Sequence, residues 1–298
     1  MVINQAALQA IYVNLKTTFD ARMEITETYW EKVASKVPST GKSNDYKWLG
    51  AFPMLREWIG ERQIQNISAY EYLIRNKSFE ATIGVDRDDI EDDNLGVYVP
   101  VVEQLADSSK KHPDKLIFDL MVNGFSNTCY DGEIFFSAAH PVGGTTYSNV
   151  QAGSGNPWFL MDTKKPLKPF LYQHRRDPEF VSFTDLKDPN VFWKKEYIYG
   201  VDYRGNVGYA FWQQAFASKA DLTVSNYSAA RLAMRTLKNE KGVPLDVSPN
   251  LLVCGPSNEE AAREILEVDV IYNTSGDGSW QKNLWRNSCD LLVVPWLD

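Results

Sequence analysis

Residues 92–124, DDNLGVYVPVVEQLADSSKKHPDKLIFDLMVNG, carry a pattern typical of a long helical rod. The opening run Asp92–Asn94 has residue types that cap helix N-termini, and Pro100 is tolerated if it lies in the first turn. Apolar residues recur at helical spacing on both sides of Pro113, and Gly124 is a plausible C-cap. Because proline cannot donate to the helical ladder, we predict a rod that is broken at His112-Pro113 and then restarts.

The stretch before the rod predicts a β-hairpin over residues 70–85. Apolar and aromatic residues alternate over 70–74 and again over 79–85, as they do on strands with one covered face. Arg75–Ser78 is the predicted turn, since asparagine tolerates the backbone of a tight turn. A lone two-stranded hairpin is marginal in water, so we expect it to lie on a neighbouring molecule.

The N-terminal segment combines a helix with an aromatic-rich stretch. Leu8, Ile11, Leu15 and Phe19 fall on one helical face, and Pro38–Asp45 has the composition of a loop. This short segment offers little core of its own, so another domain or another subunit must cover its aromatic side chains. The aromatic residues of this stretch are Tyr46, Trp48, Phe52 and Trp58.

The remainder of the chain mixes strands and helices without a regular alternation. Strand-like pieces occur at 158–160, 170–172, 197–203, 208–216, 251–253 and 291–294. A helix is predicted over about 226–240, and a capping box at Ser257–Glu260 predicts a second helix through Leu266. This order of elements predicts an α+β fold.

The composition narrows the class of protein. The chain has 298 residues, 44% of them hydrophobic, which is enough apolar surface for a folded core. Its net charge of −8 and the lack of a dense Lys/Arg cluster argue against a protein that grips nucleic acid. No apolar run approaches the roughly 20 residues that span a bilayer, and Met1–Asn4 does not begin a leader sequence.

Few residues in the sequence suggest a catalytic or metal-binding role. The three cysteines, Cys129, Cys254 and Cys289, match no disulfide or zinc pattern, and we expect buried reduced thiols. Cys129, Asp131 and His140 are the residue types of a cysteine hydrolase, but no signature accompanies them, and we favour a buried or loop-fixing His140.

The acidic run 86–93 fails as an EF-hand loop, because Glu91 stands where glycine is needed. We expect this run to cap a helix and to pair with a basic patch on a neighbour, with a loose calcium site as the alternative. Nucleotide-binding loops are also absent from the sequence, so neither a cofactor nor a metal is expected.

Six blocks in order carry a family resemblance. The sequence resembles the Mu-like phage and prophage major head subunit family over nearly its whole length. The blocks are Arg56–Arg62; Asn76-Lys77 with Phe79-Glu80, Asp92-Asp93 and Gly96–Tyr98; Tyr130–Gly132 with Phe135-Phe136 and His140-Pro141; Lys168–Phe170 with Gln173, Arg175 and Pro178; Gly200–Arg204 with Asn206, Gly208-Tyr209 and Trp212-Gln213; and Pro249–Val253 with Ala261 and Ile265-Leu266.

The resemblance implies the Hong-Kong-97-type capsid fold. Its parts would be an N-terminal arm (1–66), an extended hairpin loop (67–93), a peripheral domain with a spine helix (94–221), an axial domain (222–285) and a C-terminal strand that returns to the core (286–298). The family fold is discontinuous in sequence, so periodicity does not show where the axial domain begins. Bendable connections are expected at Pro38–Asp45 and at His112-Pro113.

The resemblance also implies a function. The chain would be the major capsid protein of a tailed bacteriophage or prophage, assembled in the bacterial cytoplasm into pentamers and hexamers of an icosahedral virion shell around double-stranded DNA. It would not be an enzyme and would bind DNA without sequence specificity. Separate scaffold, portal and decoration proteins would be its partners.

Eleven residues are expected at contacts between subunits: Tyr46, Trp48, Phe52, Trp58, Tyr70, Tyr72, Asn76, Lys77, Phe79, Asp92 and Asp93. The alternative for about half of the aromatic residues is a place in the core of their own subunit. Three alternatives remain open. They are a cysteine hydrolase that uses Cys129 and His140, an encapsulin-like container, and another virion part such as a portal or decoration protein.

Overall fold

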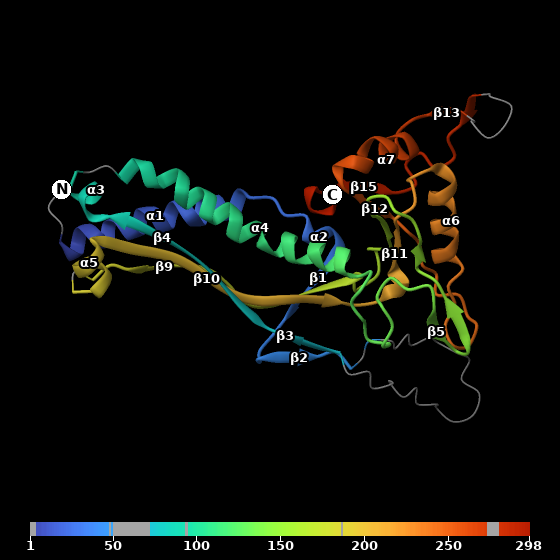
Figure 1. Cartoon of the computed structure of the whole chain (residues 1–298), viewed down its shortest axis with the longest axis horizontal. Coiled ribbons are helices and arrows are strands. Elements are labelled where there is room, and N and C mark those ends of the chain that lie inside the picture. The colour runs from blue at the N-terminus through green and yellow to red at the C-terminus, as the bar shows by residue number, and fades with distance from the viewer. Residues whose placement is uncertain (1–3, 48, 50–71, 93–94, 186, 273–279) are drawn as a thin grey trace.

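A four-stranded sheet with two long strands forms the elongated half of the molecule (Figure 1). The computed structural model describes residues 4–47, 49, 72–92, 95–185, 187–272 and 280–298. The sheet order is β1 (Ala34–Pro38), β9 (Phe170–Phe183), β10 (Glu196–Tyr209) and β4 (Lys77–Asp86). Strand β1 runs parallel to β9, and the other two pairs are antiparallel.

Two long helices cover one face of this sheet (Figure 1). Helix α1 (Gln5–Ile25) buries its predicted stripe of Leu8, Ile11, Leu15 and Phe19, so that prediction is confirmed. On the sheet, side chains two residues apart point to the same face, and Tyr197, Tyr199, Val201 and Tyr203 are all buried.

An ion pair fixes α1 along the second helix. Arg22 donates from Nε and from Nη2 to the two carboxylate oxygens of Asp107, both at 2.8 Å. This paired geometry holds the pKa of Asp107 well below its usual range, through hydrogen bonds from Arg22 and then Thr26.

The second helix, α4 (Val99–Asn123), is continuous, and the predicted break at Pro113 is wrong. Pro113 and Asp114 are both buried, and Asp114 Oδ1 accepts the backbone N–H groups of Tyr29 (2.9 Å) and Trp30 (2.7 Å). Burial and these bonds offset the helical hydrogen bond that proline removes. The predicted Pro100 in the first turn and the C-cap at Gly124 are confirmed.

The predicted capping role of Asp92 is wrong for α4. Asp92 instead ends a short helix, α3 (Arg87–Glu91), and a 3-10 turn, η1 (Leu95–Tyr98), precedes α4. Asp86 caps α3 by accepting the N–H of Asp88 at 2.7 Å, so the acidic run does cap a helix. Asp93 and Asn94 lie outside the described residues.

The predicted pairing of residues 70–74 with 79–85 is also wrong. Strand β3 (Leu73–Arg75) pairs with β2 (Ser43–Asp45), whereas β4 pairs with β10. Asn76 makes no tight turn, because its side chain donates to Ser39 Oγ (2.7 Å) and to the Gly41 carbonyl (2.9 Å). The predicted linker Pro38–Asp45 therefore contains a strand and is tied down by Asn76.

A five-stranded sheet forms the second half of the molecule. Its order is β15 (Asp290–Val293), β12 (Leu251–Cys254), β8 (Trp158–Met161), β11 (Ala215–Ser218) and β7 (Val150–Gln151). Helices α6 (Val224–Arg235) and α7 (Glu259–Leu266) lie beside it (Figure 1). The predicted strands at 158–160, 251–253 and 291–294 are confirmed here.

Short elements complete this half and the connections. The predicted capping box is wrong, because Asn258 precedes α7 without a side-chain cap and the Ser257 hydroxyl instead donates to Asp298 at 2.6 Å. The remaining elements are α2 (Trp30–Val33), α5 (Pro189–Lys194), β5 (His140–Val142), β6 (Thr145–Tyr147), β13 (Val270–Tyr272), β14 (Trp280–Lys282), η2 (Trp212–Gln214), η3 (Pro256–Asn258) and η4 (Pro295–Leu297).

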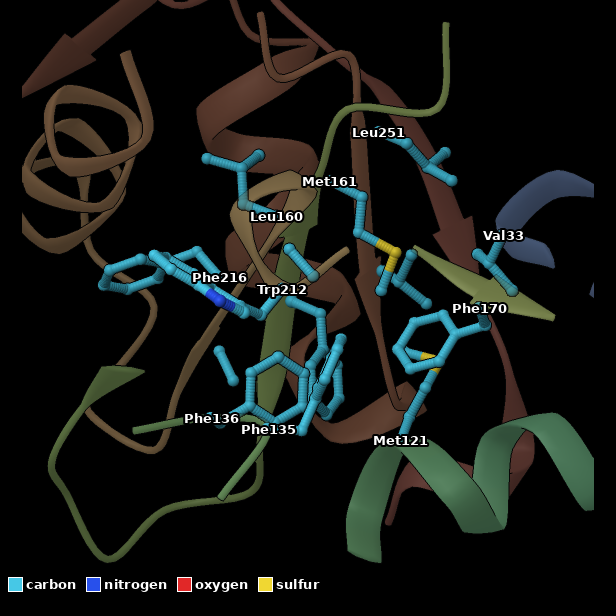
Figure 2. Close-up of a cluster of buried hydrophobic side chains, with 14 of the residues drawn as sticks. Val33, Met121, Phe135, Phe136, Leu160, Met161, Phe170, Trp212, Phe216 and Leu251 are labelled. Carbon is cyan, nitrogen blue, oxygen red and sulfur yellow. The ribbon is translucent and has the colours of Figure 1, made fainter. Parts of the chain in front are cut away.

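Helix α4 contributes to two hydrophobic clusters. Val102 and Leu105 belong to the cluster under the elongated sheet. Ile117, Phe118 and Met121 belong to the larger cluster, where Met121 lies beside Phe170 (Figure 2). One helix thus joins the two halves, and the α+β prediction is confirmed.

Replacing Phe118 with Ala should destabilise the unassembled subunit by about 3–5 kcal/mol. Phe118 is fully buried and its ring stacks on Trp296 with centroids 5.5 Å apart, so truncation leaves a cavity. Urea unfolding measures the change. Val122→Ala is the matched control, since Val122 is 40% exposed on the same helix, and it should cost less than about 0.5 kcal/mol. Equal stability of both variants would contradict the packing role of Phe118.

Candidate assembly surfaces

The outer end of the elongated half exposes two adjacent aromatic residues on helix α5. Phe192 is 73% exposed and Trp193 is 79% exposed, and their rings touch edge to face with centroids 4.9 Å apart. A helix this short can bury one side only, which Val191 provides, and Lys195 ends it in the left-handed region at φ +56°. The two aromatics therefore remain in solvent in the single chain.

The acidic helix α3 lies beside α5 at this end (Figure 1). The backbone N–H of Arg87 donates to the Lys195 carbonyl at 2.8 Å, and Lys195 Nζ lies 3.4 Å from Asp88. We define the tip as α3 and α5 together. It combines two exposed rings with carboxylates and lysines, a mixture typical of protein interfaces.

The sheet face opposite α1 and α4 exposes apolar side chains next to the tip. Val181 and Phe183 are exposed there and lie in register with Gly200 and Ile198 of β10. Farther along the same face, Arg176 pairs with Asp202. Val181 is 45% exposed and Phe183 is 51% exposed, so these side chains are available for contact.

The opposite end of the molecule also exposes large apolar residues. Trp280, on strand β14, is 70% exposed, and Leu284 just after it is 82% exposed. The hairpin of β13 and β14 lies beyond α7, far from the tip (Figure 1). The two ends of an elongated subunit thus carry exposed apolar groups, as expected for a protein that bonds to copies of itself on several sides.

Comparison with known proteins gives these surfaces a context. The model of the family described as Mu-like prophage major head subunit gpT matches residues 8–297. The chain belongs to this family. The major capsid protein of Escherichia phage Mu is 38% identical over 308 residues and the full length of both chains. The Mu-like prophage FluMu major head subunit of Haemophilus influenzae is 39% identical over 275 residues, 88% of this chain and 89% of that protein.

Solved capsid structures are also similar to this chain. The procapsid of bacteriophage JBD30 has a TM-score of 0.84 at 40% identity, covering 99% of this chain and all of the other. The JBD30 capsid has a TM-score of 0.79 at 29% identity over the full length of both chains. The JBD30 capsid decorated with minor capsid protein trimers has a TM-score of 0.77 at 30% identity over 90% of each chain.

The head subunit is therefore a major capsid protein of a tailed phage and a component of the virion. Its fold is the Hong-Kong-97-type capsid fold, so the expectations drawn from the family resemblance are confirmed for family, fold and function. In the described part of the chain, no helix combines the length and apolar character needed to cross a bilayer.

The head subunit uses several of the predicted contact residues within its own chain. Tyr46 is buried and donates from its hydroxyl to Gln173 Oε1 at 2.8 Å, and burial raises its pKa. Tyr72 is half-buried, and its hydroxyl accepts the backbone N–H of Tyr209 at 2.8 Å. For these two aromatics the structure supports the alternative of a place in the subunit's own core.

The remaining predicted contact residues divide in three ways. Asn76 is tied to its own chain, and Phe79 packs half-buried against His112 and Tyr203. Lys77 and Asp92 are exposed. The predicted residues that lie outside the described part of the chain are Trp48, Phe52, Trp58, Tyr70 and Asp93.

Sequence reasoning missed the tip and the β14 end. The signal for the tip was the run Phe192–Lys195, in which two adjacent aromatics and two lysines follow Pro189. Only one face of the short helix that proline starts can be buried, so one of the large rings had to face solvent. Trp280 and Leu284 gave no comparable signal, because Trp280 lies singly among polar residues and Leu284 has only Trp285 as an apolar neighbour in the sequence.

The structure does bring Cys129, Asp131 and His140 together. Cys129 Sγ donates to Asp131 Oδ1 at 3.0 Å, and His140 Nδ1 lies 2.7 Å from Asp131 Oδ2. Burial, and next the charge of Asp131, raise the pKa of Cys129, which disfavours the thiolate that a cysteine hydrolase needs. His140 is fully buried and stacks on Trp212 at 3.9 Å, as the loop-fixing interpretation predicts.

The double variant Phe192→Ser/Trp193→Ser should fold and yet assemble poorly. Removing two exposed rings costs little inside the subunit, but interface aromatics of this kind contribute about 2 kcal/mol or more to a contact. We expect the assembled fraction in size-exclusion chromatography to fall by on the order of tenfold, with an unchanged circular dichroism spectrum. Val13→Ser, at an exposed position on α1, is the control. Normal assembly of the double variant would exclude the tip as a contact.

Proposed function

We propose that copies of this head subunit assemble into the pentamers and hexamers of an icosahedral shell that encloses double-stranded DNA without reading its sequence. The observation that carries this proposal is the pair of exposed apolar ends on an elongated, two-cluster subunit. Contacts at both ends let each copy bond within a ring and between rings. A net charge of −8 favours enclosure of DNA over a tight grip on it.

We further propose how the shell fold divides this chain. The elongated half, with α4 as the spine helix, would be the peripheral domain, and the half around the five-stranded sheet would be the axial domain. Strands β7, β8 and β11 belong to that sheet, so the axial domain would extend beyond the predicted 222–285. The arm would end before β2 and would therefore be shorter than the predicted 1–66, and 286–298 would return β15 to the axial sheet.

The extended loop would also differ from the predicted 67–93. Strand β2 pairs antiparallel with β3. We propose that these two strands form the base of the extended loop. Strand β4 is paired with β10 throughout its length and would remain in the peripheral domain.

The proposal assigns no catalytic role to the subunit. Burial raises the pKa of Cys129 and so disfavours a nucleophilic thiolate, and His140 is fully buried; both features support this view. The JBD30 capsid is decorated with minor capsid protein trimers, and we propose a decoration protein for this shell as well. Separate scaffold and portal proteins would complete the set of partners, inside the host cytoplasm where the shell forms.

Self-assembly of the purified chain tests the proposal. The protein expressed alone is analysed by size-exclusion chromatography with light scattering and by negative-stain electron microscopy. Pentamers, hexamers, tubes or closed shells are expected, because both ends offer contacts in every copy. A clean monomer over a wide range of concentration and salt would contradict assembly by the subunit's own contacts. The monomer would then be screened for hydrolase activity with Cys129→Ser as the reference.

A further inference from the structure

A buried histidine lies in the segment that joins α4 to β7. His140 Nε2 is 3.2 Å from the carbonyl oxygen of Phe135, and Nδ1 is 2.7 Å from Asp131 Oδ2. The ring stacks on the ring of Trp212, with an interplanar angle of 7°. Both ring nitrogens therefore lie close to oxygen atoms, the ring is fully buried, and Asp131 beside it is partly exposed.

These contacts hold metal-binding atoms of His140 and Asp131 side by side. Nδ1 lies 2.7 Å from Asp131 Oδ2, which is the distance of an N–H···O hydrogen bond. A divalent metal ion would replace the hydrogen of that bond and bind the nitrogen and the carboxylate together.

A third donor atom points to the metal ion. Cys129 Sγ is 3.0 Å from the other oxygen of the same carboxylate, and ligand atoms of all three side chains lie within 4.8 Å of one another. Zinc bonds of about 2.0–2.3 Å place tetrahedral ligand atoms about 3.5 Å apart, which lies between these contact distances and the full span. Sulfur, imidazole nitrogen and carboxylate oxygen are the ligand types that zinc accepts.

We propose that Cys129, Asp131 and His140 bind a divalent metal ion of the zinc class, with a water molecule as the fourth ligand. The sequence predicted no metal here, because this spacing matches no zinc pattern. Regular zinc motifs take their ligands in closely spaced pairs. Here a turn at Asp131–Glu133 and the short strand β5 bring single ligands together.

The charges balance in the metal-bound site. With metal, a thiolate, a carboxylate, a neutral ring and a doubly charged cation sum to zero. Binding would release the proton of the Cys129 thiol, because the thiolate is the ligand, and would leave no net charge in the buried site.

The surrounding hydrogen bonds orient the side chains that would bind the ion. His140 Nε2 lies 3.2 Å from the Phe135 carbonyl oxygen, and an Nε2–H that donates to this oxygen would fix the ring so that Nδ1 faces the proposed ion, an arrangement common among metal-binding histidines. Asn149 Nδ2 donates to the same carbonyl at 2.8 Å. The backbone N–H of Glu133 donates to Asp131 Oδ1 at 3.1 Å and orients the carboxylate.

The proposed ion would have a structural role. The segment 125–149 contains two three-residue strands, β5 and β6, and its remainder is held by hydrogen bonds of turns and loops. A metal bridge from Cys129 to His140 would fasten this segment beside Trp212 and the core of the second half. The role is independent of shell assembly, so its test does not depend on the proposed function.

The test measures metal in the full-length protein. The chain is expressed with zinc, dialysed against metal-free buffer and analysed by elemental mass spectrometry. We expect about one zinc ion per chain. Cobalt exchange should then give a thiolate-to-cobalt charge-transfer band and the intense visible bands of a four-coordinate site. Cys129→Ser should lose the charge-transfer band and on the order of tenfold or more of the zinc. Cys289→Ser, at a hydrogen-bonded thiol elsewhere, should keep both.

Two results would overturn the proposal. The first is wild-type protein that takes up neither zinc nor cobalt, which would show that hydrogen bonds alone hold the three side chains together. The second is a charge-transfer band that persists in folded Cys129→Ser, which would place the metal at another cysteine. If Cys129→Ser fails to fold by circular dichroism, Cys289→Ser provides the test. A charge-transfer band that persists in Cys289→Ser supports the proposal, and loss of the band there overturns it.

Discussion

The structure depends on one constraint, the continuity of helix α4 across two hydrophobic cores. Its first half packs under the elongated sheet through Val102 and Leu105, and its second half enters the other core through Phe118 and Met121. A helix is stiff along its axis, so the two halves keep one relative position. Asp114 supports this continuity beside Pro113, because it holds the start of α2 against the helix.

That stiffness has a consequence for assembly. Side chains that cannot reach either core remain outside, and the largest of them lie at the two ends, on α5 and after β14. A stiff subunit with exposed apolar ends stabilises contacts with its copies without first ordering itself, which lowers the entropic cost of association. The same features would be a liability in a protein that works alone, and the family relationship explains why they are present.

The periodicity of apolar residues correctly predicted the elements that depend mainly on local sequence. The α1 stripe, the end of α4 at Gly124 and the buried strands near Trp158 and Leu251 follow from periodicity and were predicted correctly. Strand partners were not, because β3 pairs with β2 and β4 pairs with β10, far away in sequence. The helix through Pro113 is a case in which tertiary packing outweighs local propensity.

The candidate surfaces were harder to predict than the fold. Aromatic content singled out Tyr46 and Tyr72, but exposure depends on the whole fold, and the subunit covers both. The central claim is that the apolar ends of the single chain become contacts in the shell. Cryo-electron microscopy of assembled particles tests it most directly. The account predicts that Trp193 and Leu284 are buried against neighbouring copies; closed shells in which both remain exposed to solvent would contradict it.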